Sequence, residues 1–151
     1  MADTIRETII KAIKTGLENF GSYEVIAPSP IVVRGFLVFD ASVYPLPVIS
    51  IMPGIEDAER EEYGASANTM SIDLWCSILS GQEEMSETGE AILGELVKAF
   101  MASVPANVRD AFYTGGGPSY PDGIAQKVLM TLASFNVVYE TDLGDPYTLS
   151  A

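Results

Sequence analysis

The stretch from Gln126 to Leu149 contains the feature that most constrains the fold. From Lys127 onward, one set of alternate residues is apolar or small: Leu129, Thr131, Ala133, Phe135, Val137 and Tyr139. Alternation with a period of two is typical of a β-strand that has one buried face. At about 3.3 Å per residue, a strand from Lys127 to Val138 crosses a whole small domain. We therefore expect a sheet of that length. The polar tail over 142–151 is expected to leave the sheet as a C-terminal extension.

The rest of the sequence predicts two helices and several further strands. In chain order we expect a helix over 3–20, strands over 31–39 and 48–52, an acidic loop over 54–67, a strand over 69–79, a helix over 87–103, a short strand over 108–113 and the long strand over 127–138. Runs of strands with short connections favour antiparallel pairing. We predict a single α+β domain over 1–151, with a mainly antiparallel or mixed sheet of about five strands packed with two helices.

Capping and turn residues set the expected ends of these elements. Thr4 and Glu7 fit a capping box at the start of the first helix, and Gly21 fits a left-handed terminator at its end. Ser86 is the expected N-cap of the second helix. Pro53 and the glycine after it are expected to end the strand over 48–52. The glycine-rich stretch over 115–123 is expected to be a flexible connection.

Composition limits the class of protein. The chain has 151 residues, of which 48% are hydrophobic, so it can bury a core in one domain without disulfides. Its single cysteine cannot form an intrachain disulfide, which suggests a reducing compartment such as the cytoplasm. The N-terminal residues mix charges in a helical pattern and do not resemble a signal peptide. No apolar run approaches the ~18 residues of a membrane span, so we expect no membrane partner.

The charge balance argues against a nucleic-acid-binding protein. The chain has eight basic and 21 acidic residues, which give a net charge of −13 and a pI near 4.1. Proteins that bind DNA usually carry a basic patch, because neutralised phosphates supply much of their affinity. Here the basic residues are scattered singly along the chain. The acidity promotes solubility, and it also suits a surface that must not hold a polyanion.

The residues that usually carry catalysis are scarce. The chain has no histidine, the commonest general acid–base and metal ligand near neutral pH. Cys76 lies on the apolar face of its expected strand, which indicates an inert core thiol. Gly115–Gly117 lacks the lysine and following helix of a phosphate-binding loop. An enzyme using carboxylates alone, as glycosidases do, needs a pair in a cleft, and no such pair is evident. We expect no enzymatic activity and no cofactor.

The acidic loop has two interpretations. Its carboxylates could bind a divalent cation, because Ca²⁺ and Mg²⁺ prefer oxygen ligands, but the spacing of a calcium loop is missing. A solvated or partner-facing charge run is the favoured interpretation. The carboxylates concerned are Glu56, Asp57, Glu59, Glu61 and Glu62.

Trp75 also has two interpretations. It falls on the polar face of the strand over 69–79, between Asp73 and Ser77. It could pack under a helix as part of the core, or it could anchor a partner, since aromatic residues are enriched at interfaces.

Two segments resemble a known family. The strand Thr69–Leu79 (TMSIDLWCSIL), which leads into a helix, and the end Phe135–Tyr147 (FNVVYETDLGDPY) are similar to those of tail-terminator, or tail-completion, proteins of long-tailed bacteriophages. The resemblance extends to the order of elements over most of the chain. It implies a virion protein, assembled in the host cytoplasm, that forms a hexameric ring on the tail tube. Such a ring stops tube polymerisation and meets the head connector or stopper protein, while DNA passes through without specific binding.

Two alternatives remain open at this point. The chain could be another head–tail connector or neck protein, or a small acidic module that binds a basic protein. The candidate interface or lumen residues are the five carboxylates of the acidic loop together with Trp75, Asp142, Asp145 and Tyr147.

Overall fold

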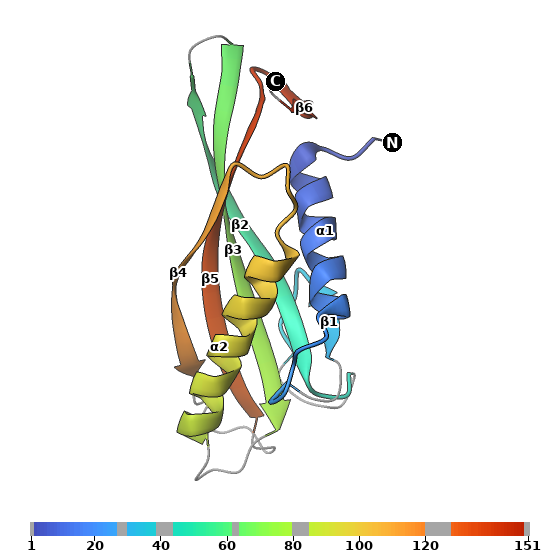
Figure 1. The fold of residues 1–151 in the computed structure, drawn as a ribbon, viewed down its shortest axis with the longest axis vertical. Helices are drawn as coiled ribbons and strands as arrows, with labels where there is room; N and C mark the ends of the chain where they lie inside the picture. Colours follow the sequence, from blue (N-terminus) through green and yellow to red (C-terminus); the bar gives the residue numbers. More distant parts are fainter. Residues whose placement is uncertain are drawn as a thin grey trace.

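The computed structural model describes residues 2–26, 30–38, 44–61, 64–79, 85–119 and 128–149. Among these residues, two helices lie side by side on one face of a six-stranded sheet (Figure 1). The helices are α1 (Ile5–Asn19) and α2 (Met85–Ser103). The strands are β1 (Ile31–Arg34), β2 (Val48–Arg60), β3 (Ala65–Leu79), β4 (Asp110–Ser119), β5 (Val128–Asp142) and β6 (Asp145–Leu149).

The sheet is mixed. Its strands are ordered β1-β2-β3-β5-β4, and β6 pairs with the end of β5. β1 runs parallel to β2, whereas the other pairings are antiparallel. The predicted α+β class, with a mixed sheet and two packed helices, is confirmed.

The first helix begins at the predicted N-cap, but the Glu7 side chain makes a different contact from the one predicted. The backbone N–H of Glu7 donates to Thr4 Oγ1 at 3.1 Å, as in a capping box. The Glu7 side chain does not complete that box: its carboxylate binds the Arg34 guanidinium on β1 through two contacts of 2.5 and 2.6 Å. The helix ends because Phe20 adopts an extended conformation, and Gly21 is not in the left-handed region, so its predicted role is wrong.

The strand predicted over 48–52 is much longer than expected. β1 ends at Arg34, which pairs with Ile51, so β2 lies at the edge of the sheet beyond that point. An edge strand tolerates Pro53 because no neighbouring strand needs its missing N–H. Gly54 and Ile55 together oppose one residue of β3 in a β-bulge, after which pairing resumes at Glu56. The prediction that Pro53 ends the strand is therefore wrong.

The predicted acidic loop over 54–67 is largely strand. β2 continues to Arg60 and β3 begins at Ala65, so the acidic residues form the distal end of a long hairpin. This end projects beyond the helices (Figure 1). Gly64, with φ of 76°, lies in the turn, and the N–H of Glu61 donates to the carbonyl of Ala65 at 2.9 Å.

The second helix and the glycine-rich stretch also differ from prediction. α2 starts at Met85, so Ser86 lies inside it and is not its N-cap. It ends at Ser103, before Pro105, as predicted. The predicted connection over 115–123 is wrong for 115–119, because these residues belong to β4; residues 120–123 lie outside the described residues. A Cβ atom on Gly116 would overlap the backbone carbonyl oxygen of Leu132, so this close strand pairing requires glycine.

The last strand is longer than predicted, and the tail does not leave the sheet. β5 runs to Asp142 instead of ending at Val138, and Lys127 lies outside the described residues. β5 pairs with β3 at every position from Val128 to Asp142. The chain then reverses at Leu143 and Gly144, where Gly144 has φ of 78°, and β6 pairs back onto β5. The predicted C-terminal extension is therefore a short hairpin; residues 150–151 lie outside the described residues.

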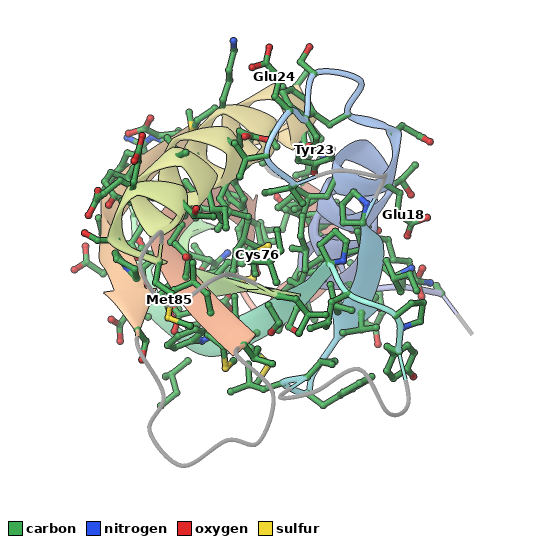
Figure 2. The ribbon with its side chains drawn as sticks, turned by 90° about the horizontal axis from the view of Figure 1, so that it is seen from below. Glu18, Tyr23, Glu24, Cys76 and Met85 are labelled. Carbon is green, nitrogen blue, oxygen red and sulfur yellow. The ribbon has the colours of Figure 1, made fainter. Side chains whose placement is uncertain are left out.

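The core lies between the helices and one side of the sheet, which we call the inner face; the opposite side is the outer face. Buried inner-face residues of β3 and β5 alternate with partly exposed ones, as the sequence predicts. Phe100 of α2 stacks on Phe135 of β5 with ring centroids 3.8 Å apart. Cys76 lies in this interior (Figure 2), and burial raises the pKa of its thiol, which is therefore inert.

One carboxylate of α2 binds the segment of chain that connects α1 to β1. Glu95 of α2 accepts hydrogen bonds from the backbone N–H groups of Glu24, Val25 and Ile26, at 2.8 to 3.2 Å. Nearby, the Tyr23 hydroxyl donates to the Leu17 carbonyl at 2.8 Å, and burial raises the pKa of this tyrosine. These contacts bind the end of α1 to α2.

Candidate interaction surface

Among the described residues, the outer face is covered mainly at the end where β2 begins and β3 ends. There Val33, Val38 and Val48 form a small apolar cluster, and Ser77 Oγ donates to the Val38 carbonyl at 2.6 Å. The same end contains Ser50, which is fully buried and whose hydroxyl has no hydrogen-bond partner among the described residues. Further along the strands, the outer-face side chains are partly exposed.

Trp75 lies where this cover ends. It stands opposite Ser50 of β2 and Leu132 of β5, and both Trp75 and Leu132 are partly exposed. Both helices lie on the inner face, so the interpretation that a helix covers Trp75 is wrong. Met52 is partly exposed in the next row of the sheet. Together, Met52, Trp75 and Leu132 make an apolar centre on the outer face.

Small polar residues and one acid follow this centre. Asp73 accepts a hydrogen bond from the Ser134 hydroxyl at 2.7 Å, across the β3–β5 pair. In the following row Ser71, Asn136 and Phe112 lie side by side, and Phe112 is 43% exposed at the sheet edge.

The distal end of the outer face is acidic. Residues directly opposite each other in a sheet point to the same face. Asp57, Thr69, Val138 and Asp110 form one such row, in which the two aspartates are exposed. The next positions add Glu59, Glu140 and Asp142 to the same face. We call Asp57, Glu59, Asp110, Glu140 and Asp142 the acidic end.

Two basic residues lie near this acidic end in the described part of the chain, Arg60 and Arg109. Arg60 follows Glu59 in β2 and pairs with Ser66, so it lies on the opposite side of the strand, whereas Arg109 contacts the acids directly. The Arg109 guanidinium contacts Glu61 at 3.0 Å and Glu140 at 2.7 Å. These contacts connect the β2–β3 hairpin to β5. The hydrogen bond to Glu61 and the neighbouring acids raise the pKa of Arg109. Asp57, Glu59, Asp110 and Asp142 form no ion pair with any described cation.

Glu56 differs from the other acids of the hairpin because it lies on the inner face. It pairs with Met70, and its carboxylate contacts Arg6 of α1 at 3.6 Å and accepts a hydrogen bond from the Tyr139 hydroxyl. Burial, followed by this hydrogen bond, raises the pKa of Tyr139. Arg6 also donates to the Gly54 carbonyl at 2.5 Å. Glu56 therefore binds the hairpin to α1 instead of presenting a free charge.

The C-terminal hairpin carries three predicted residues. Asp142 is exposed at the end of β5 and pairs with Asp145 of β6. The Asp145 carboxylate accepts hydrogen bonds from the Thr148 hydroxyl at 2.8 Å and the Tyr147 N–H at 2.9 Å, which lower its pKa. Tyr147 itself is 51% exposed.

Two shallow grooves flank this hairpin. One, of about 220 Å³, is polar and lies on the inner face among Glu56, Asn68, Tyr139, Thr141 and Asp145. In it, Asn68 Nδ2 donates to Thr141 Oγ1 at 3.1 Å. The other, of about 420 Å³, lies where β4 begins and β6 ends, beside Arg109, Glu140 and Leu149. Within the described ranges, no three His, Cys, Asp or Glu residues are grouped to hold a metal ion.

The structure thus divides the predicted site residues among separate places. Asp57 and Glu59 share the outer face with Trp75 and Asp142. Glu56 is engaged on the inner face, Glu61 is paired with Arg109, and Asp145 and Tyr147 lie on β6. Glu62 lies outside the described residues.

Sequence reasoning missed the residues that complete the outer face. Asp110 and Phe112 join it only through the pairing of β4 with β5, which no local pattern indicates. Alternation along the strand puts Glu140 on the face opposite to Phe135 and Tyr139, but its contact with Arg109 depends on the path of the chain before β4.

No family model matches the chain, and no curated protein is significantly similar to it. No helix among the described residues is long and apolar enough to cross a membrane.

Proposed function

We propose that this protein is a structural assembly protein of the tail-terminator kind. It forms a homo-oligomeric ring, expected to be a hexamer, that caps the tail tube of a long-tailed bacteriophage, ends tube polymerisation and offers a face to the head connector. The proposal starts from the resemblance of Thr69–Leu79 and Phe135–Tyr147 to that family. The structural observation that favours it is a sheet longer than its helices, one face of which is largely uncovered by the part of the chain that the structure describes.

The uncovered face supports an assembly role because a sheet normally buries its apolar residues against another layer. Here the helices bury only the inner face, while Met52, Trp75 and Leu132 stay partly exposed on the other. The β2–β3 hairpin and the β5–β6 hairpin also project past the start of α1 (Figure 1). Projecting strands of this kind can reach a neighbouring subunit without disturbing the core.

The charge of the chain also suits a ring through which DNA moves. Each subunit carries −13, so six copies carry about −78, and a negative surface repels a polyanion. The free energy of DNA binding comes largely from neutralised phosphates, which an acidic ring does not provide.

Negative-stain electron microscopy of the purified chain, combined with sedimentation, tests the proposal. We expect six-fold rings with a central hole, and the same rings at the end of tubes when the tube protein of the phage is present. A protein that stays monomeric at high concentration and never appears at a tube end would refute it. Rings located elsewhere in the virion neck would favour the alternative of another head–tail joining protein.

Single substitutions refine this test. If the C-terminal hairpin contacts the neighbouring subunit, Tyr147→Ser should lower the fraction of rings. Leu79→Ser is the matched control, because Leu79 is equally exposed, at 53% against 51%, and lies at the opposite end of the sheet. Equal losses in both variants would exclude a specific role for the hairpin.

A further inference from the structure

The outer face has the layout of a protein–protein interface. Such interfaces have a core enriched in aromatic residues and Met, surrounded by a polar and charged rim. Met52, Trp75 and Leu132 supply an apolar centre, and Asp73 and Ser134 supply polar groups beside it. The acidic end supplies a charged rim on one side only.

A surface whose only role was to repel DNA would not need the apolar centre. Repulsion of a polyanion requires negative charge, and exposed apolar side chains add nothing to it. The exposed part of a tryptophan beside a leucine and a methionine gains free energy when another surface removes it from water. The apolar centre therefore indicates that a partner covers this face.

We infer that the outer face is a docking surface for a basic protein, whose Lys or Arg residues meet Asp57, Glu59 and Asp110 while an apolar side chain covers Trp75. Charge complementarity selects this partner. Arg109 is already paired with Glu61 and Glu140, and Arg60 lies on the opposite side of β2 from Asp57 and Glu59. A second copy of this chain would bring its own net charge of −13 against the same carboxylates.

The two long edge segments of the sheet, β4 and the part of β2 beyond β1, do not offer a comparable site. β4 is interrupted by a bulge between Tyr113 and Gly115, and the open part of β2 contains Pro53 and its own bulge. Bulges and prolines are features that prevent a further strand from pairing at an edge. The partner is therefore expected to contact the face and not to extend the sheet. The inference does not depend on ring formation, because it concerns one face of a single subunit.

Trp75 makes the inference directly measurable, since it is the only tryptophan in the chain. The probe is a short amidated peptide in which Lys and Leu alternate, titrated at low salt into the full-length protein. We expect the emission of Trp75 to shift to shorter wavelength, and Kd to rise steeply with salt. A companion peptide in which Ser replaces Leu should bind more weakly and leave the emission nearly unchanged.

Charge-matched variants locate the binding. The double variant Asp57→Lys, Glu59→Lys should raise Kd about tenfold, because two favourable charge contacts become repulsive. The control Glu18→Lys, Glu90→Lys makes the same change in net charge on exposed positions of α1 and α2, away from the outer face. It should raise Kd at most about twofold, through the change in net charge alone.

Three results would overturn the inference. They are equal losses of affinity in the two double variants, binding without a change in Trp75 emission, and no binding at low salt. Thermal unfolding of each variant confirms that it is folded before its Kd is compared.

Discussion

The carboxylate of Glu95 gives the sharpest stability prediction. It accepts hydrogen bonds from three consecutive backbone N–H groups, those of Glu24, Val25 and Ile26. Ile26 is completely buried, so its N–H cannot turn to water when the carboxylate is removed. The substitution Glu95→Ala should therefore lower the free energy of unfolding.

The magnitude follows from the burial of each donor. A buried donor left without a partner costs about 1–3 kcal/mol, and each bond to a charged acceptor contributes about 1.5–3 kcal/mol when it cannot be replaced by water. The N–H of Glu24 is exposed and regains water, whereas Val25 is partly buried and Ile26 is completely buried. We expect a loss of about 3 kcal/mol for Glu95→Ala and about 1 kcal/mol for Glu95→Gln, which keeps one acceptor oxygen.

Urea unfolding and amide hydrogen exchange test this prediction. For a chain of this size, 3 kcal/mol corresponds to a decrease in Tm of about 6–12 °C. Exchange of the Val25 and Ile26 amides should accelerate more than that of amides in β3 and β5. Glu90→Ala, an exposed position on the same helix, is the control and should change stability by less than about 0.5 kcal/mol. A loss below about 1 kcal/mol in Glu95→Ala, or unchanged exchange at Val25 and Ile26, would refute the reasoning.

Three further predictions concern two glycine positions and the pH dependence of stability. Gly116→Ala should destabilise the protein by about 2 kcal/mol or more, because its Cβ would overlap the Leu132 carbonyl; urea unfolding measures the loss. Gly94→Ala should instead stabilise it by about 0.5–1 kcal/mol, because this helical position has open space; a lower urea midpoint for this variant would contradict the prediction. The hydrogen bond from Arg34 lowers the pKa of Glu7 below its usual 4.5, so its contribution to stability is present above about pH 4.5 and is lost as pH falls through the lowered value. Glu7→Gln should remove that part of the acid dependence of Tm, and an unchanged pH profile would refute it.

The elements that sequence predicted best are those in which one face is buried. β3 and β5 alternate between buried and exposed residues over most of their length, so a period of two is visible locally. The distal part of β2 has no such signal, because both of its faces are at least partly exposed from Gly54 onward. An acidic strand without a buried face cannot be told from a loop by its composition. Its pairing with β3 is therefore visible only in the structure.

The face of the sheet on which each acidic residue of β2 lies depends on a one-residue shift in the alternation of the strand. Before the bulge, Ile49 and Ile51 point to the inner face, and simple alternation would place Asp57 and Glu59 there too. Because Gly54 and Ile55 together oppose one residue of β3, the alternation shifts by one residue beyond the bulge. Glu56 thereby points to α1, and Asp57 and Glu59 point to the outer face. No local sequence pattern predicts this shift, since its cause is the register with β3.

The uninterrupted pairing of β3 with β5 has a mechanical consequence. The two strands are paired from Ala65 with Asp142 to Leu79 with Val128, over 15 residues of each, a length of about 50 Å. A force applied along this axis, between the distal hairpin and the opposite end, acts parallel to the strands and therefore shears all the cross-strand hydrogen bonds at once. A force across the axis, applied at the distal end, would open them one after another from the Ala65–Asp142 pair onward. The domain is therefore stiffest along its own long direction, so a push at the acidic end moves the far end of the sheet with little bending.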